Sequence, residues 1–284
     1  MILQREIAEV AERLRVNKST IDKDWVLGHF INALYGNESL NEHLIFKGGT
    51  CLRKCYFENY RFSEDLDFTV AASDFRFSHD VLQQICTVVE SQSGIRTHIQ
   101  KLEPLVSNGQ PTGFQADVKF WGADHPRNQA PLPPDRWQTR IKIDVILYEE
   151  MRFEAVRRPL LHPYSDREQL TATPRCYAIN EVLAEKLRAL VQRKYTAPRD
   201  YYDLWYLSRT DEMLDWPVIV AAFHQKMTFK GLTFEGPRQL LNDQHHKTLT
   251  AHWQQTLVHQ VPVGQLPALP AVLTELEHLF LRIF

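Results

Sequence analysis

The feature that most constrains the fold is a change in the spacing of apolar residues near residue 160. Before this point, apolar and polar residues alternate in several short stretches, the period of a β-strand with one buried face. After it, apolar residues recur every three or four positions, the period of an amphipathic helix. The chain is therefore predicted to fold as an α/β part followed by a helical part.

The predicted strands are interleaved with helices. A short apolar run ended by Gly48-Gly49 predicts a strand at 43–46, and alternation predicts strands at 65–70, 114–120 and 141–147. Helices are expected near 49–57 and 76–91. This order predicts a mixed α/β (α+β) fold with a mixed sheet over roughly residues 40–150. The proline-rich stretch 128–136 predicts an exposed loop within that region.

Helical periodicity predicts the two ends of the chain. A first helix is expected over 5–15, and Ser19 with Asp22 resembles a capping box before a second one. Five further helices are expected at 180–195, 199–208, 216–227, 247–258 and 270–283. The domain organisation predicted from these patterns is N-terminal helices packing on the core (1–40), an α/β core (41–160) and a helical domain (161–284).

Composition excludes several classes of protein. With 44% hydrophobic and 24% charged residues the chain has ordinary globular composition, and a net charge of -2 gives no general attraction for nucleic acid. Arg5 and Glu6 interrupt the region where a signal peptide needs an apolar core, and no stretch approaches the roughly 20 apolar residues of a membrane span. A cytoplasmic protein without membrane contact is expected.

Four cysteines, Cys51, Cys55, Cys86 and Cys176, are too few for a disulfide framework in a chain of this size. Cys51 and Cys55 lie one helical turn apart and could share a metal ion. However, no second cysteine pair or close histidine pair completes a tetrahedral set. The cysteines are therefore predicted to be small apolar fillers with free thiols.

Two aspartates stand on the same face of a predicted strand. Asp65 and Asp67 are two residues apart, so their carboxylates project side by side. Adjacent carboxylates raise each other's pKa unless a cation lies between them, and Mg²⁺ is a hard ion that prefers oxygen ligands. The alternative is a solvated strand edge, which an isolated Asp-x-Asp pattern more often represents.

Lys47-Gly48-Gly49-Thr50 precedes these aspartates by one helix. A strand that ends in two glycines and runs into a helix leaves backbone N–H groups free, and the glycines permit close approach of a phosphate. On its own this pattern is more typical of an ordinary turn. Its position before the Asp-x-Asp strand favours a phosphate site.

A third carboxylate lies within an apolar strand. Asp144 is flanked by Ile143 and Val145 and is predicted to point away from the face that carries them. A buried acid is costly without a partner. If this strand lies beside the Asp-x-Asp strand, Asp65, Asp67 and Asp144 converge and can hold two cations for in-line nucleotidyl transfer. Asp144 would then be the base that accepts a proton from the attacking hydroxyl.

The combined pattern Gly48-Gly49-Thr50, Arg61-Phe62-Ser63-Glu64-Asp65-Leu66-Asp67-Phe68 and Asp144 resembles the nucleotidyltransferase superfamily. Its Arg-Phe-Ser-x-Asp-x-Asp-Phe form is similar to the AbiEii/AbiGii toxin family, including MenT-like members. The resemblance implies a polymerase-beta-like core followed by a helical C-terminal part. It also implies an NTP as donor substrate and a two-ion Mg²⁺ site.

The helical part carries the most basic short stretch of the chain, around Lys186, Arg188, Arg193, Lys194 and Arg199. Triphosphate binding is one use of such a stretch. The other is structural, because Asp200 and Asp203 can pair with Arg193 and Arg199 and lock two helices together. The nearby aromatic residues are mostly predicted to be core, with one or two able to stack on a base.

The resemblance implies a role for each of these residues. Asp65, Asp67 and Asp144 would bind metal, and together with Lys186 they would form the catalytic set. Nucleotide binding is implied for Gly48, Gly49, Thr50, Arg61, Ser63, Lys186, Arg193, Arg199, Asp200 and Asp203.

The function expected is transfer of a nucleoside monophosphate from an NTP to an acceptor hydroxyl. By resemblance the protein would be a toxin of a toxin–antitoxin or abortive-infection system, acting on a tRNA 3′ end and bound by a cognate antitoxin. Two alternatives remain open at this point: an NTP-binding regulatory module without turnover, and a nucleotidyltransferase acting on a protein or a small molecule.

Overall fold

The computed structural model describes residues 2–70, 75–107, 109–126, 128–210 and 214–284. The chain divides into two compact units. The first unit consists of Met1–Glu149 and Ala155–Cys176, and the second consists of Glu150–Glu154 and Tyr177–Phe284. None of the helices in the described ranges is both long and apolar enough to cross a bilayer.

The first unit is built around a seven-stranded sheet with the strand order β3-β4-β5-β2-β1-β7-β6. The strands are β1 (Leu44–Lys47), β2 (Asp65–Val70), β3 (Arg96–Ser107), β4 (Gln110–Trp121), β5 (Arg140–Ile146), β6 (Val156–Arg157) and β7 (Arg175–Cys176). Strand β2 is parallel to β5 and antiparallel to β1. The predicted mixed sheet is therefore confirmed.

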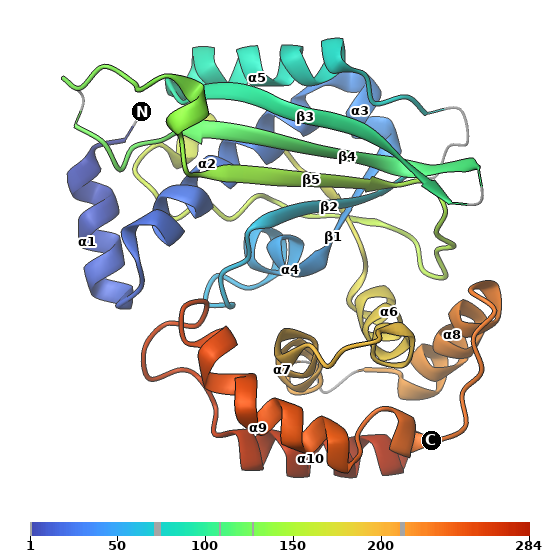
Figure 1. Cartoon of the computed structure of the whole chain (residues 1–284). Coiled ribbons are helices and arrows are strands. Elements are labelled where there is room, and N and C mark those ends of the chain that lie inside the picture. Colours follow the sequence, from blue (N-terminus) through green and yellow to red (C-terminus); the bar gives the residue numbers. More distant parts are fainter. Residues whose placement is uncertain (1, 71–74, 108, 127, 211–213) are drawn as a thin grey trace. The chain divides into compact units, whose positions relative to one another are not determined.

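Helices of the first unit share one apolar core with the buried side chains of this sheet, and α5 lies next to β3 in Figure 1. These helices are α1 (Gln4–Leu14), α2 (Lys18–Gly36), α3 (Glu38–His43), α4 (Gly48–Cys51) and α5 (His79–Ser93), with a π-helix at Leu52–Tyr56 and 3-10 turns at Pro134–Arg136 and Arg167–Gln169. The apolar residues of the strands alternate as predicted. Leu66, Ile143 and Val118 are fully buried, so their polar neighbours are left on the opposite face.

The predicted capping box at Ser19 is wrong. Helix α2 begins at Lys18 with Asn17 as N-cap, so Ser19 already lies inside the first turn. Asp22 points into the protein instead, where it is buried and accepts a hydrogen bond from the backbone N–H of Ala123 at 2.7 Å. A long-range partner for this carboxylate replaces the local cap.

Three strands did not follow from the sequence pattern. Strand β3 is the sheet edge, and its side chains are mostly exposed or half-buried, so it lacks the apolar alternation that marks the other strands. Strands β6 and β7 have two residues each, and β7 follows residue 160, where no further strands were expected. Such short strands form because the neighbouring backbone is already in place to accept them.

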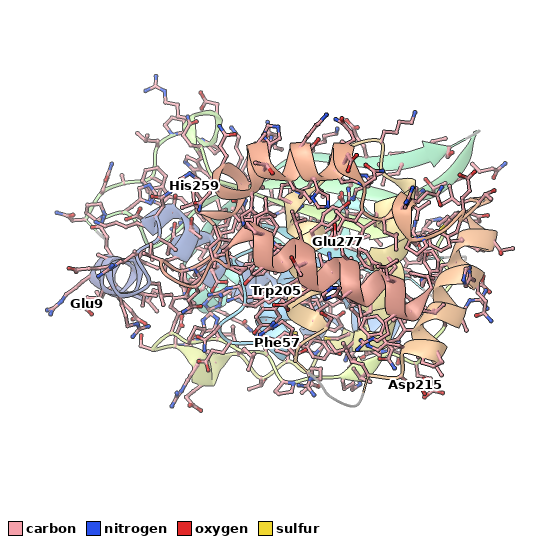
Figure 2. All side chains as sticks on the ribbon, turned by 90° about the horizontal axis from the view of Figure 1, so that it is seen from below. Glu9, Phe57, Trp205, Asp215, His259 and Glu277 are labelled. Atoms are coloured by element: carbon pink, nitrogen blue, oxygen red, sulfur yellow. The ribbon has the colours of Figure 1, made fainter. Side chains whose placement is uncertain are left out.

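The described residues of the second unit, 150–154, 177–210 and 214–284, contain five α-helices at the predicted places. They are α6 (Ile179–Gln192), α7 (Pro198–Leu207), α8 (Trp216–Phe229), α9 (Asp243–Leu257) and α10 (Leu269–Ile283), with a 3-10 turn at Pro237–Gln239. Side chains of α10 connect it to two of the others. Glu277, labelled in Figure 2, pairs with His246 of α9 at 2.8 Å, and the indole N–H of Trp205 in α7 donates to Glu275 at 3.0 Å.

A buried ion pair joins Glu150–Glu154 to the helices of the second unit. Lys226 of α8 and Glu181 of α6 are both fully buried, with 2.5 Å between Nζ and Oε1. The other oxygen of Glu181 accepts from the backbone N–H groups of Arg152 and Phe153, and Lys226 donates to the carbonyl of Glu150. These bonds explain why a segment from the middle of the chain belongs to this unit.

Candidate active site

The Gly-Gly turn connects β1 to α4 and lies directly against Asp67. Gly48 has φ +79°, a left-handed conformation that favours glycine. A Cβ atom built there would overlap the Oδ2 atom of Asp67. The absence of a side chain at residue 48 therefore allows the backbone and this carboxylate to approach each other.

Gly49 makes a second close approach, to residues of the segment that precedes β2. A Cβ atom at residue 49 would lie 2.8 Å from Nη2 of Arg61 and 2.9 Å from Oγ of Ser63. Thr50 fixes the same region through its hydroxyl, which donates to the carbonyl of Asp65 at 2.5 Å. The turn and the start of β2 thus form one closely packed group.

The three predicted carboxylates lie on two neighbouring strands. Asp65 and Asp67 are in β2 and Asp144 is in β5. The parallel register places Asp67 directly opposite Asp144. Opposite residues on adjacent strands project from the same face of the sheet. That face is the polar one, because Ile141, Ile143 and Val145 are fully buried on the other side of β5.

The pKa of Asp67 is shifted by its burial and by its position among these charged residues. Burial raises the pKa of its carboxyl to about 6, with Lys47 opposing the shift and Asp65 and Asp144 adding to it. Lys47 is the residue opposite Asp67 on β1. A carboxylate whose charged form is disfavoured in this way is stabilised by a cation close to it.

Two neighbours hold Asp144 in place. The Nε2 amide of Gln115 donates to Oδ1 at 3.0 Å, and Nζ of Lys142 lies 2.6 Å from Oδ2. Gln115 is opposite Asp144 on β4, and Lys142 is two residues before it on β5. Sequence reasoning did not single out either residue. The alternation of polar and apolar residues in β4 and β5 could have identified them, because it places both side chains on the same face as Asp144.

The carboxylates fit a hard divalent cation. Three acidic side chains on adjacent strands offer only oxygen ligands, the kind that Mg²⁺ prefers. Lys47 and Lys142 lower the pKa of Asp67 but do not offset the larger effect of burial, which raises it. Asp65, Asp67 and Asp144 are the residues of the first unit that would hold such an ion.

Two of the predicted basic residues of the second unit, Lys186 and Arg193, form an ion-pair cluster with aspartates of α7. Lys186 of α6 contacts two aspartates of α7, with its Nζ 3.1 Å from Asp200 and 2.6 Å from Asp203. Arg193 lies 2.8 Å from the other oxygen of Asp200. The aspartates are almost fully buried, whereas Arg193 is one-third exposed. This cluster joins α6 to α7, as the structural interpretation of the sequence required.

The structural interpretation of the sequence also expected Arg199 to pair with one of these aspartates. Arg199 lies half-buried in the first turn of α7 and, within the described ranges, forms no ion pair with either aspartate. Of the aromatic residues, Tyr201 and Tyr202 are buried core residues. Tyr195 is 60% exposed, and its hydroxyl accepts from Arg193 at 2.7 Å. Tyr195 is therefore the aromatic side chain here that a ligand can reach.

Comparison with known proteins gives two consistent findings. A family model described as nucleotidyl transferase AbiEii toxin, type IV toxin–antitoxin system, matches residues 32–275. Among solved structures, the chain is similar to MenT4, a nucleotidyltransferase toxin from Mycobacterium tuberculosis H37Rv, with a TM-score of 0.65 and 19% identity. That alignment covers 100% of this chain and 90% of MenT4, and it shows a shared fold. A search of curated proteins gave no match.

Proposed function

Because the chain belongs to the AbiEii family of nucleotidyltransferase toxins of type IV toxin–antitoxin systems, we propose that it transfers a nucleoside monophosphate from an NTP to an acceptor hydroxyl in a magnesium-dependent reaction. The observation that supports this most directly is the register that sets Asp67 opposite Asp144, two residues along the strand from Asp65. Divalent ions bound by these carboxylates would stabilise the attacking and leaving oxygens of an in-line displacement.

Asp144 is the group proposed to accept the proton of the acceptor hydroxyl. Gln115 and Lys142 each bind one of its two oxygens, so the side chain has a defined orientation. A general base requires such positioning and typically contributes 10²–10⁴-fold to the rate. Lys142 must give up part of its contact with Asp144 when a metal ion or the hydroxyl takes that oxygen.

The Gly-Gly turn is proposed to bind phosphate. Gly48 and Gly49 begin α4 next to Asp67, so their backbone N–H groups belong to the first turn of a helix, and Thr50 anchors the turn to β2. Arg61 and Ser63, which lie against Gly49, add a guanidinium and a hydroxyl to the same group. Backbone N–H groups at the start of a helix and an arginine are the usual partners of phosphate oxygens.

The ion-pair cluster of the second unit is proposed to contribute to triphosphate binding. Lys186 would contact the phosphates and neutralise the leaving pyrophosphate, with Arg193, Arg199, Asp200 and Asp203 in support. The aspartates hold Lys186 in position from two sides.

We further propose a tRNA 3′ end as the acceptor and a cognate antitoxin protein as the partner. The family supports an antitoxin in general terms. A net charge of -2 means that tRNA must be recognised by a local surface. The acceptor proposal is therefore the part of the function that an experiment should address first.

The test is to incubate the purified protein with each α-³²P-labelled NTP, Mg²⁺ and total tRNA, and to separate the products on a denaturing gel. Label on tRNA is expected with the wild type. We expect Asp65→Ala to abolish labelling and Asp144→Asn to slow it by about 10²–10⁴-fold. Glu103→Gln, a change in an exposed carboxylate on the edge strand β3, is the matched control and should label normally.

Other outcomes would point to the alternatives. Label on protein, or on a small molecule added as acceptor, would replace tRNA as the substrate but retain the transferase chemistry. Binding of NTP by titration without label on any acceptor would indicate a regulatory module. Equal labelling by the wild type and Asp65→Ala would refute the assignment of the catalytic carboxylates.

A further inference from the structure

Within the described ranges, two groups of side chains are close enough to share a metal ion outside the carboxylate site. One consists of His29, His162 and Asp166. The oxygens of Asp166 already accept hydrogen bonds from both histidines, at 3.1 and 3.0 Å, and from Trp25 at 3.0 Å. These hydrogen bonds already occupy Asp166 and tie α2 to the segment around residue 165, although Nδ1 of His162 has no hydrogen-bond partner among the described residues.

The other group consists of Cys51, Cys55 and Cys176, whose sulfur atoms all lie within 4.8 Å of one another. Cys51 and Cys55 come from α4 and the π-helix that continues it, whereas Cys176 comes from β7. All three belong to the first unit. Sequence spacing placed only the first two together, so the third sulfur is brought in by the pairing of β7 with β1.

From this juxtaposition we propose that Cys51, Cys55 and Cys176 form a site for a soft metal ion in three-sulfur coordination, with Cu(I) as the ion that fits best. Thiolate ligands select soft ions such as Cu(I) and zinc. Three sulfurs bound about 2.3 Å from one ion in their plane lie about 4 Å apart, which is within the separation found here. In the described part of the chain, no histidine or carboxylate joins the three thiols.

The group offers three ligands among the described residues, and soft metal ions differ in the number of ligands that they require. Structural zinc sites are almost always tetrahedral with four protein ligands. The nearby Tyr35 hydroxyl is already hydrogen-bonded to the carbonyls of Leu44 and Arg175. The three cysteines are at most 1% exposed, so a water molecule from solvent cannot readily serve as a fourth ligand of the ion. A monovalent ion that accepts three ligands therefore fits this site better than zinc.

A cationic group lies close to the three thiols. The guanidinium of Arg158 donates to the carbonyl of Cys55 at 3.2 Å, and a neighbouring positive charge favours the thiolate form of cysteine. Binding of Cu(I) by three thiols would release their remaining protons to solvent, because the thiolate is the ligand.

Burial also argues against a redox function for these cysteines. A thiol that exchanges disulfides with another protein must be accessible, whereas these three are enclosed in the core. An ion bound during folding would instead link β7 to the helix that begins at the Gly-Gly turn. π-helical turns such as Leu52–Tyr56 are rare and frequently mark functional sites.

The test is to titrate the reduced, metal-free full chain with Cu(I) under anaerobic conditions against the competing chelator bicinchoninate. One equivalent should bind, with a thiolate charge-transfer absorption and a shell of three sulfurs by X-ray absorption spectroscopy. Cys176→Ala and Cys55→Ser should each weaken binding at least about 100-fold, since losing only an outer-shell partner of a metal ligand costs 10–100-fold. Cys86→Ala, which changes the buried cysteine outside the group, should bind normally.

Stability provides a second readout if a variant folds poorly. Cu(I) should raise the Tm of the wild type and of Cys86→Ala but not that of Cys176→Ala or Cys55→Ser. The proposal is overturned if the wild type binds no Cu(I), if the ion has only two sulfur ligands, or if the Cys176 and Cys55 variants bind as the wild type does. These results are independent of nucleotidyl transfer.

Discussion

The backbone of residue 48 lies in close contact with the carboxylate of Asp67. Gly48 combines a left-handed φ of +79° with the close approach of Asp67. Gly109, in the connection between β3 and β4, has nearly the same φ of +76° but has no atom within 4 Å of a Cβ built there. Alanine substitutions at these two glycines therefore distinguish the effect of backbone strain from the effect of a clash with Asp67.

Gly109→Ala should lower stability by about 1–2 kcal/mol because of the left-handed backbone, and Gly48→Ala should lower it by more because its Cβ would also overlap Asp67. Only Gly48→Ala should also displace Asp67, and a displacement of about 1 Å in a catalytic group can lower the rate about a hundredfold. Urea unfolding and nucleotidyl transfer by the two variants are the measurements. Equal loss of transfer in both would show that strain alone is responsible.

The pH dependence of stability should reflect Asp22. Burial raises the pKa of this carboxyl from 3.8 to about 7. Between these values the folded protein binds more protons than the unfolded chain, so its stability falls as the pH rises. Asp22→Asn removes this titration but retains an acceptor for the N–H of Ala123.

The wild type should therefore lose stability relative to Asp22→Asn between about pH 4 and 7, by up to about 1.4 kcal/mol per pH unit. Above pH 7 the difference should stay constant. Unfolding free energies of both proteins from urea titrations at several pH values test this. Parallel pH profiles for the two proteins would show that Asp22 does not titrate in this range.

At the scale of elements, pairs of helices are held together by buried charges. In the second unit, Lys226 of α8 pairs with Glu181 of α6, and both side chains are fully buried. Removing one member of a buried ion pair leaves the other charge without compensation, which costs about 3–5 kcal/mol. Glu181 would retain only its bonds to the N–H groups of Arg152 and Phe153.

Lys226→Met should accordingly destabilise the protein by about 3–5 kcal/mol. Lys247→Met, at an exposed position of α9, should change stability by less than about 0.5 kcal/mol. The unfolding free energies in urea provide the comparison. A loss below about 1 kcal/mol for Lys226→Met would mean that the segment around Glu150 does not depend on this ion pair.

The sheet shows the same dependence on neighbours. Alternation predicted β2, β4 and β5, because each has a buried apolar face, and a short apolar run predicted β1. The edge strand β3 lacks that pattern and is ordered by its pairing with β4. Pairing between β2 and β5 also sets Asp67 opposite Asp144, a relation between residues 77 positions apart in the sequence.

For the whole molecule, membership of the AbiEii family predicts toxicity that depends on catalysis. Induced expression of the wild type without antitoxin should stop growth of the host culture. Asp65→Ala and Lys186→Ala should each remove this effect, because one alters the carboxylate group and the other the proposed phosphate contact. Glu103→Gln should remain toxic.

Growth curves with matched protein levels, checked by immunoblot, measure this. Equal toxicity of the wild type and both variants would exclude an enzymatic origin of the effect. Loss of toxicity in Asp65→Ala but not in Lys186→Ala would confine catalysis to the first unit and leave the ion-pair cluster of α6 and α7 with its structural role.

Some properties of this protein follow from the sequence by itself. Apolar periodicity identifies the alternating strands and the five C-terminal helices, because burial of one face repeats at the period of each element. The motifs at Gly48-Gly49-Thr50, at 61–68 and at Asp144 resemble the nucleotidyltransferase superfamily. Each periodic element and each short motif is local, so neighbouring residues carry enough information to reveal it.

Other properties depend on contacts between distant residues, and only the tertiary structure decided them. Gln115 and Lys142 reach Asp144 through strand register, and Cys176 reaches Cys51 and Cys55 through the pairing of β7 with β1. Asp22 turned inward to a distant N–H group instead of capping its own helix. In each case the packing of whole elements determines which residues come into contact. The spacing of residues along the chain does not reveal these contacts.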